Sequence, residues 1–101
     1  RVVCCMSDGE HQEGQTWEAV MSAHKWNLGN LIAIMDYNHL QIEGTTDEIM
    51  PLGNLAEKYS SFGWSVREID GHNFTEILEA FSWADKNEQP TMIVAHTTLG
   101  K

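Results

Sequence analysis

The fold of this chain is decided by the stretch Leu31-Ile32-Ala33-Ile34-Met35-Asp36, in which apolar residues follow one another without alternation up to the aspartate. A strand whose two faces are both buried shows such a continuous run, which is typical of parallel sheets covered by helices on both sides. The stretch therefore predicts an inner strand of a parallel sheet. Short apolar runs and amphipathic segments alternate around it, without an internal repeat.

The neighbouring segments predict the remaining elements of an α/β domain. We expect further strands at residues 2–6, 64–69 and 91–95, and helices from Gly14 or Gln15 to Asn27, from Pro51 to Gly63, and at 74–84. The order βαβαβαβ predicts a three-layer α/β/α fold with a mostly parallel sheet and right-handed crossovers. Residues 37–50 are expected to form a long connection.

Local signals mark the helix ends and faces. Asn73 suits an N-cap because Glu76 stands three residues later. Gly29 fits the left-handed position that often follows a helix. Helical spacing also predicts apolar stripes that face the core. The stripe of the first helix is Trp17, Val20, Met21, His24 and Leu28, and that of the third is Phe74, Ile77, Leu78, Phe81 and Ala84.

Length and composition indicate one globular domain with one core. The chain has 101 residues, 42% of them hydrophobic, and a net charge of -9 that is spread along the sequence. This charge opposes binding to nucleic acid or to an anionic membrane. No stretch approaches the ~20 apolar residues of a membrane span, and we expect a cytoplasmic protein.

The chain ends and the cysteines support two further expectations. Arg1 leads directly into a strand, and residues 97–101 follow the last strand without a terminal helix, so we expect a domain truncated at both ends. Cys4 and Cys5 point to opposite faces of the first strand, which disfavours a disulfide between them. We expect both to be buried, reduced thiols, as in a cytosolic protein.

Polar residues gather where the predicted strands end. In open parallel sheets, ligands bind outside the carboxyl ends of the strands. Residues 7–10, 36–40 and 70–72 follow the first three strands at this edge. Asp8 and Asn38 come after successive strands, so their side chains converge on one ion if those strands are neighbours.

The donor types at this edge favour a hard divalent cation. An aspartate oxygen, an amide oxygen and a backbone carbonyl suit Mg²⁺ or Ca²⁺ rather than zinc or copper. Gly9 lets the backbone approach a phosphate, and the first helix begins close enough to direct its positive end there. We infer a magnesium diphosphate as the ligand; the alternative is that Asp8 and Gly9 only form a turn.

Two longer motifs resemble those of a known family. Residues 7–19, SDGEHQEGQTWEA, resemble the thiamine diphosphate motif of transketolases, in which GDG is followed by EG and a helix of WEA type. Residues 36–44, DYNHLQIEG, are similar to its distal half, D-x-N-x-L-Q-I-D-G. The stretches 62–64, 69–72 and 97–101 also look like transketolase, so the resemblance covers nearly the whole chain. It departs at Ser7, which stands in place of the first glycine.

The resemblance implies roles for residues in both motifs. Asp8 and Asn38 would bind Mg²⁺ or Ca²⁺ through their side chains, and Leu40 through its backbone carbonyl. Glu13 would lie near a subunit interface and help to link two active sites, which is an indirect catalytic role. Ile42 is as compatible with ordinary core packing as with a cofactor contact. The residues implied to bind thiamine diphosphate are Asp8, Gly9, Glu10, Asn38, Leu40 and Ile42.

The histidines lie outside these implied roles. His24 is on the apolar stripe of the first helix, which favours packing. His11 follows the diphosphate-binding residues, and it either packs or lies near substrate. His72 either shapes the turn after the third strand or approaches the site. His96 and Thr97 end the last strand at the ligand-binding edge, where no spacing argument supports a ligand contact.

The implied activity is transfer of a two-carbon glycolaldehyde unit from a ketose phosphate to an aldose phosphate, dependent on thiamine diphosphate. The implied partner is a pyrimidine-binding domain or subunit, in a homodimer or heterotetramer, without which the chain is an incomplete enzyme. Two alternatives stay open. One is another thiamine diphosphate enzyme such as deoxyxylulose-phosphate synthase, and the other is a non-catalytic transketolase-like module with a structural or regulatory role.

Overall fold

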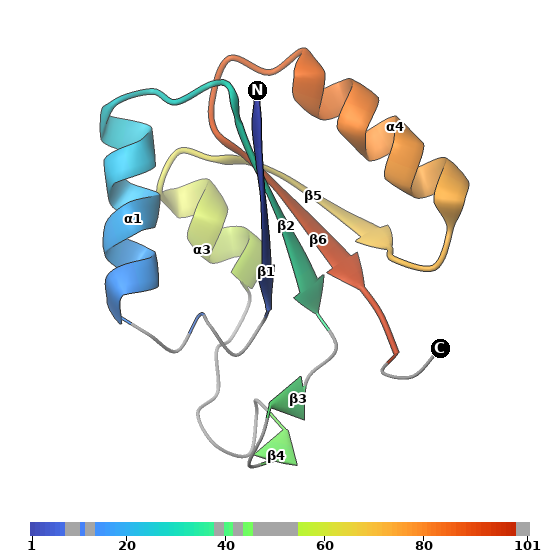
Figure 1. The fold of residues 1–101 in the computed structure, drawn as a ribbon. Helices are drawn as coiled ribbons and strands as arrows, with labels where there is room; N and C mark the ends of the chain where they lie inside the picture. Colours follow the sequence, from blue (N-terminus) through green and yellow to red (C-terminus); the bar gives the residue numbers. More distant parts are fainter. Residues whose placement is uncertain (8–10, 12–13, 38–39, 42–43, 46–54, 99–101) are drawn as a thin grey trace.

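A computed structural model of the chain describes residues 1–7, 11, 14–37, 40–41, 44–45 and 55–98 (Figure 1). Its main feature is a four-stranded sheet with the strand order β1-β2-β6-β5. The strands are β1 (Val2–Ser7), β2 (Leu31–Tyr37), β5 (Ser65–Asp70) and β6 (Thr91–His96). Every pairing in this sheet is parallel, which confirms the predicted sheet.

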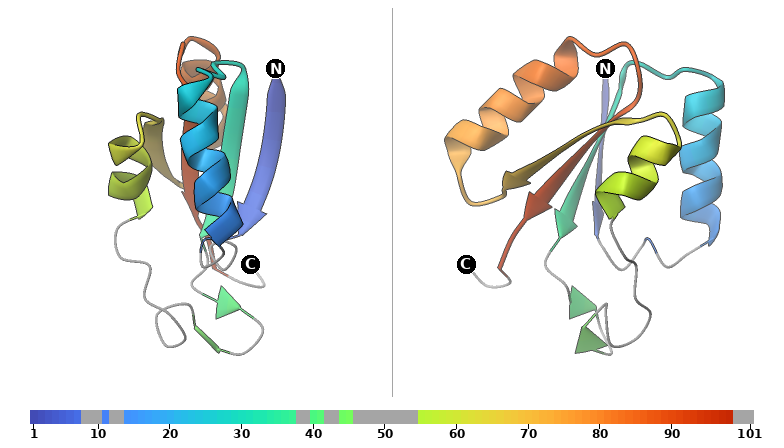
Figure 2. Two further views of the ribbon diagram at one scale, coloured as in Figure 1. Left: turned by 90° about the vertical axis from the view of Figure 1, so that its left-hand side faces the viewer. Right: turned by 180° about the vertical axis from the view of Figure 1, so that it is seen from behind.

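Helices cover both faces of the sheet. α1 (Gly14–Lys25) and α3 (Leu55–Ser61) pack on one face, and α4 (Phe74–Asp85) packs on the other (Figure 1, Figure 2). The step from β5 back to β6 runs across the sheet in the opposite direction to the step from β1 to β2. Because parallel crossovers are right-handed, this reversal places α4 on the opposite face. The structure confirms the α/β/α fold class.

Strand β6 forms the centre of the core. Its residues from Thr91 to Ala95 are all buried, because β6 has a paired strand on each side and helices on both faces. The alternation of side chains along the strand divides the core in two. Met92 and Val94 belong to the cluster beneath α1 and α3, whereas Ile93 and Ala95 belong to the cluster beneath α4.

The first helix is followed by a left-handed residue, but that residue is Asn27 rather than the predicted Gly29. Asn27 has a φ of 48°. The N–H of Leu28 donates to the carbonyl of Ala23, five residues earlier, at 3.1 Å, which is the hydrogen bond that defines a Schellman motif. Asparagine tolerates this conformation better than most residues. Gly29 is needed for space instead, since a Cβ there would lie 2.3 Å from the Glu88 carbonyl oxygen.

The buried face of α1 matches the predicted stripe only in part. Val20 is buried as predicted, with Ala23 beside it, and Trp17 packs partly buried against the same cluster. Met21 and Leu28 are exposed, at 54% and 41%, and His24 is exposed as well, so the stripe is wrong at these three positions. The helix meets the sheet along the line of Val20 and Ala23, and Leu28 lies beyond the end of α1 at Lys25.

The C-terminal end of the second predicted helix is confirmed. The described helix α3 covers Leu55–Ser61, and residues 51–54 lie outside the described residues. Gly63 follows with a φ of 87°, and the N–H of Trp64 donates to the Tyr59 carbonyl at 3.1 Å. This is a second Schellman motif, and its glycine stands where a left-handed residue is required.

Helix α4 begins with the predicted cap. The Asn73 side chain accepts a hydrogen bond from the N–H of Glu76 at 3.1 Å. This bond satisfies one of the amide groups that the first turn leaves without a helical partner. The Glu76 carboxylate reaches the N–H of Asp70 at 3.4 Å, so the side chain helps to order the turn before the helix.

The stripe predicted for α4 is wrong at two positions. Phe74 and Leu78 are 82% and 68% exposed, whereas Ala80 and Ala84 are buried against the sheet. Spacing alone gives weight to large apolar residues. Here the face of α4 that packs on the sheet is the one with the two alanines, whose small side chains let the helix backbone come near the strands. Phe74 and Leu78 lie outside this face.

Strand β1 is an edge strand of the described sheet. Its Cys4 and Cys5 are both free, which agrees with the predicted absence of a disulfide between them. Both are exposed, so the prediction that they are buried was wrong. A continuous apolar run does not reveal whether a strand has neighbours on both sides. Among the described residues, no helix is long and apolar enough to cross a bilayer.

We expect Gly63→Ala to lower the free energy of unfolding by about 1–3 kcal/mol, because alanine is strained at the positive φ of this residue. A Cβ at Gly63 would also lie 2.2 Å from Nδ1 of His24. Gly14→Ala is the matched control, since a Cβ on Gly14 meets nothing within 4 Å. Thermal unfolding of the complete protein should show a lower midpoint for Gly63→Ala only, and equal midpoints would contradict the prediction.

Candidate functional site

The carboxyl ends of β1 and β2 lie side by side at one edge of the sheet (Figure 1). The two strands pair in parallel, and Ser7 and Asp36 are partners in the register. The predicted metal site required these strands to be neighbours, and the structure confirms that they are. Asp8 directly follows Ser7, and Asn38 comes two residues after Asp36, so both predicted ligands follow paired strand ends.

Most of the predicted site residues lie outside the described part of the chain. These residues are Asp8, Gly9, Glu10, Glu13, Asn38 and Ile42, and their roles stay predictions. The backbone of Leu40 belongs to β3 (Leu40–Gln41), which pairs antiparallel with β4 (Gly44–Thr45) beyond the carboxyl ends of the sheet (Figure 1). The sequence predicted only a long connection here, because strands of two residues have no recognisable periodicity. The role of the Leu40 carbonyl also stays a prediction.

Ser7, the departure from the family motif, has an ordinary strand conformation. It is the last residue of β1, and among the described residues other than glycine only Asn27 has a positive φ. The backbone at Ser7 therefore does not need the conformational freedom of glycine. The Ser7 carbonyl accepts a hydrogen bond from Nδ1 of His11 at 2.9 Å. Replacement of glycine by serine is thus compatible with a well-formed strand end.

Thr97 joins the end of β6 to the end of β2. Its N–H donates to the Tyr37 carbonyl at 3.2 Å, and its hydroxyl donates to the Asp36 carboxylate. These bonds extend the pairing of β2 with β6 to the last residues before Asn38. Thr97 therefore orients the strand end that precedes a predicted metal ligand, a role that the sequence did not reveal.

His96 joins the end of β6 to β5 on the other side. Its Nε2 lies 2.9 Å from a carboxylate oxygen of Glu68, and its ring centroid lies 5.4 Å from that of Tyr37. The His96 and Glu68 side chains are 48% and 53% exposed, so solvent competes for this contact and its contribution to stability is small. His96 thus bridges neighbouring strand ends at the ligand-binding edge.

His72 shapes the turn after β5, which is one of the two roles that its sequence position left open. Its N–H donates to the Asp70 carboxylate at 3.0 Å, and its Nε2 accepts from the N–H of Thr98 at 2.9 Å. The N–H of Gly71 donates to the His96 carbonyl at 2.8 Å. The turn after β5 and the segment that leaves β6 therefore hold each other in place.

His11 is 1% exposed, so of its two predicted roles the structure supports packing. Its ring lies among Ser7, Trp17 and Tyr59. Ser7 and Trp17 are near His11 in the sequence, but Tyr59 is 48 residues away. No signal in the sequence pairs His11 with Tyr59, because only the folded chain brings α3 next to His11.

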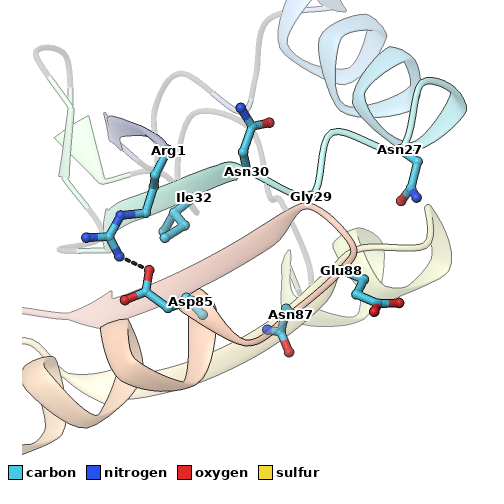
Figure 3. A pocket seen from close by; sticks show the side chains of 9 residues that line it. Arg1, Asn27, Gly29, Asn30, Ile32, Asp85, Asn87 and Glu88 are labelled. Atoms are coloured by element: carbon cyan, nitrogen blue, oxygen red, sulfur yellow. Dashed lines mark ion pairs between the residues drawn. The ribbon is translucent and has the colours of Figure 1, made fainter.

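A pocket of about 440 Å³ lies at the opposite, amino-terminal edge of the sheet (Figure 3). Asn30 and Glu88 belong to its lining, and Arg1 forms an ion pair with Asp85 at its rim. Ligands of parallel sheets bind at the carboxyl edge, so this pocket is not the predicted cofactor site. Within the described ranges, no group of three or more histidine, cysteine, aspartate or glutamate residues could hold a metal ion.

Comparison with known proteins decides the family. All of residues 1–101 match the family described as transketolase, thiamine diphosphate binding domain. The chain belongs to the transketolase family. This confirms the resemblance carried by residues 7–19 and 36–44, and it confirms a thiamine diphosphate-binding domain.

Named relatives and solved structures agree with the transketolase family. One subunit of 6-deoxy-6-sulfo-D-fructose transketolase from Clostridium sp. strain MSTE9 is 48% identical over 97 residues, which are 95% of this chain and 35% of that protein. One subunit of apulose-4-phosphate transketolase from Phocaeicola vulgatus is 42% identical over 97 residues, which are 95% of this chain and 34% of that protein. A crystal structure of transketolase from Campylobacter jejuni matches with a TM-score of 0.94 and 35% identity, covering 100% of this chain and 16% of that chain. The chain thus spans about a third of the length of the two curated relatives.

We expect Thr97→Val to lower the free energy of unfolding by about 1 kcal/mol, the usual net value of one hydrogen bond, because it removes the hydroxyl that binds Asp36. Thr98→Val is the matched control, since Thr98 joins this edge through its backbone N–H. Thermal unfolding of the complete protein measures both variants. The prediction fails if Thr97→Val unfolds at the same temperature as the control.

Proposed function

We propose that this chain is the diphosphate-binding part of a transketolase that transfers a two-carbon glycolaldehyde unit from a ketose phosphate to an aldose phosphate. The observation that carries the proposal is the parallel pairing of β1 and β2, with Ser7 opposite Asp36. Paired strands lie about 4.8 Å apart. Side chains that follow two such strand ends can share one cation, since Mg²⁺ binds oxygen at about 2.1 Å.

In this proposal Asp8 and Asn38 bind Mg²⁺ or Ca²⁺ through side-chain oxygens, and Leu40 binds it through its backbone carbonyl. These hard oxygen donors leave part of the coordination shell for phosphate oxygens, which fits a metal diphosphate. The chain carries a net charge of -9, so the cation also offsets repulsion between an acidic protein and an anionic cofactor. The further proposed contacts to the cofactor are Gly9, Glu10 and Ile42.

The contribution of this chain to the reaction is anchoring. Thiamine diphosphate, when bound, supplies a carbon nucleophile and an electron sink. α1 begins at Gly14, near the carboxyl end of β1 (Figure 1), and the positive end of its helix dipole favours an anion at this edge. Residues that hold the diphosphate place the reacting end of the cofactor and lower the entropic cost of bringing it to the substrate.

The remainder of the active site is proposed to come from a second domain or subunit. The apulose-4-phosphate and 6-deoxy-6-sulfo-D-fructose relatives are both named as single subunits of a transketolase. These names support a second subunit or domain that binds the pyrimidine end of the cofactor, in a homodimer or heterotetramer with Glu13 near the interface. The proposed substrate class is sugar phosphates, as in the name of the apulose-4-phosphate relative, whereas the other relative is named for a sulfonated sugar.

We expect thiamine diphosphate with Mg²⁺ to bind the complete assembly that contains this chain, and Asp8→Ala to abolish that binding because it removes a metal ligand. Asp85→Ala is the matched control, since Asp85 pairs with Arg1 at the opposite edge of the sheet. Calorimetric titration measures the affinity of all three proteins. Absence of binding by a well-folded, cofactor-free assembly would defeat the proposal and favour the non-catalytic alternative.

A further inference from the structure

The side chain of His11 forms a hydrogen bond with the backbone of Ser7, at the end of strand β1. Nδ1 of His11 lies 2.9 Å from the carbonyl oxygen of Ser7, four residues earlier. The residues between them in the sequence are Asp8, Gly9 and Glu10. These three are proposed to bind the metal and the diphosphate, so the hydrogen bond joins the two ends of a segment on which the proposed function depends.

The partners of His11 decide which ring nitrogen carries the proton. The Ser7 carbonyl can only accept, so Nδ1 is the donor in this bond. Nε2 of the neutral ring is then an acceptor, and it lies 2.6 Å from the hydroxyl oxygen of Tyr59, which donates. Tyr59 is fully buried at 0% exposed, so this second bond anchors His11 to helix α3 inside the core.

Other contacts hold His11 in one orientation. The indole N–H of Trp17 donates to the His11 carbonyl at 2.8 Å. The His11 ring stands edge-on to the rings of Trp17 and Tyr59, with centroids 5.7 and 5.6 Å apart. Buried and bonded through both ring nitrogens and its carbonyl, His11 joins the end of β1 to α1 and α3.

We propose that His11 is a positioning residue for cofactor binding, acting through its hydrogen bond to Ser7. The inference rests on the proposed function, because it assumes that Asp8 and its neighbours bind the metal and the diphosphate. The bond fixes Ser7 and His11, the two residues that flank positions 8–10, relative to one another before the cofactor arrives, so less conformational entropy is lost on binding. The bond to Tyr59 and the ring contacts serve the stability of the core.

Two substitutions of His11 separate the two bonds. Asparagine carries an amide nitrogen at the same number of bonds from Cα as Nδ1, so His11→Asn keeps a donor for Ser7 and loses the acceptor for Tyr59. Glutamine carries its amide oxygen at the distance of Nε2, so His11→Gln keeps the acceptor for Tyr59 and loses the donor for Ser7. Tyr59→Phe removes only the hydroxyl and leaves His11 in place.

The experiment measures two quantities for the complete assembly with each variant. Calorimetric titration gives the affinity for thiamine diphosphate with Mg²⁺, and thermal unfolding of the cofactor-free protein gives its stability. We expect His11→Gln to bind about 10- to 100-fold more weakly, as is usual when a residue that orients metal ligands is lost. We expect His11→Asn and Tyr59→Phe to unfold at lower temperature but to bind within about threefold of the unchanged protein.

Each contrary outcome has a distinct meaning. If His11→Gln and His11→Asn bind the cofactor with equal affinity, the positioning role is overturned. It is also overturned if, across all three variants, the loss of affinity is proportional to the loss of unfolding temperature. If the unchanged assembly binds the cofactor and only Asp8→Ala abolishes binding, the proposed function stands and the role of His11 is refuted. If the unchanged assembly binds no cofactor, the proposed function fails together with the inference.

Discussion

Strand β2 has a paired strand on each side, and the geometry of the whole carboxyl edge depends on this arrangement. β1 brings Ser7 level with Asp36 on one side, and β6 brings Thr97 against the last residues of β2 on the other. A slip of one residue would exchange the two faces of β2 and move the side chains of each core cluster into the other, where they do not fit. The apolar core therefore fixes the register on which the proposed cofactor site depends.

The ends of β1 and β2 are held by different parts of the fold. His11 joins the end of β1 to α1 and α3 through buried contacts, whereas Thr97 joins the end of β2 to β6 at a more exposed position. The turn after β5 supports the same edge, since His72 accepts from Thr98. The proposed ligands Asp8 and Asn38 thus follow strand ends that are held in place by the sheet and by the helical layers on both of its faces.

Small residues determine how closely the helices approach the sheet. Ala80 and Ala84 are buried between α4 and the sheet, while the larger Phe74 and Leu78 of the same helix remain exposed. Gly63, which follows α3, allows a similarly close approach to α1, because the His24 ring of α1 occupies the space that a Cβ would need. A prediction of the buried helix face that favours large apolar residues gives too little weight to alanine. The spacing of Phe74 and Leu78 therefore predicted a buried face of α4 that is formed by Ala80 and Ala84 instead.

The sequence by itself determined the α/β class, the approximate position of each strand of the four-stranded sheet, the cap at Asn73 and the family, because these depend on local periodicity and on motif spacing. It also named Asp8 and Asn38 as ligands that require neighbouring strands. Only the tertiary structure decided that β6 lies between β2 and β5, that β1 is an edge strand of the described sheet with exposed cysteines, and that His11 meets Tyr59. The physical reason is that strand order, burial and such contacts join residues far apart in the chain, where no local pattern records which partners meet.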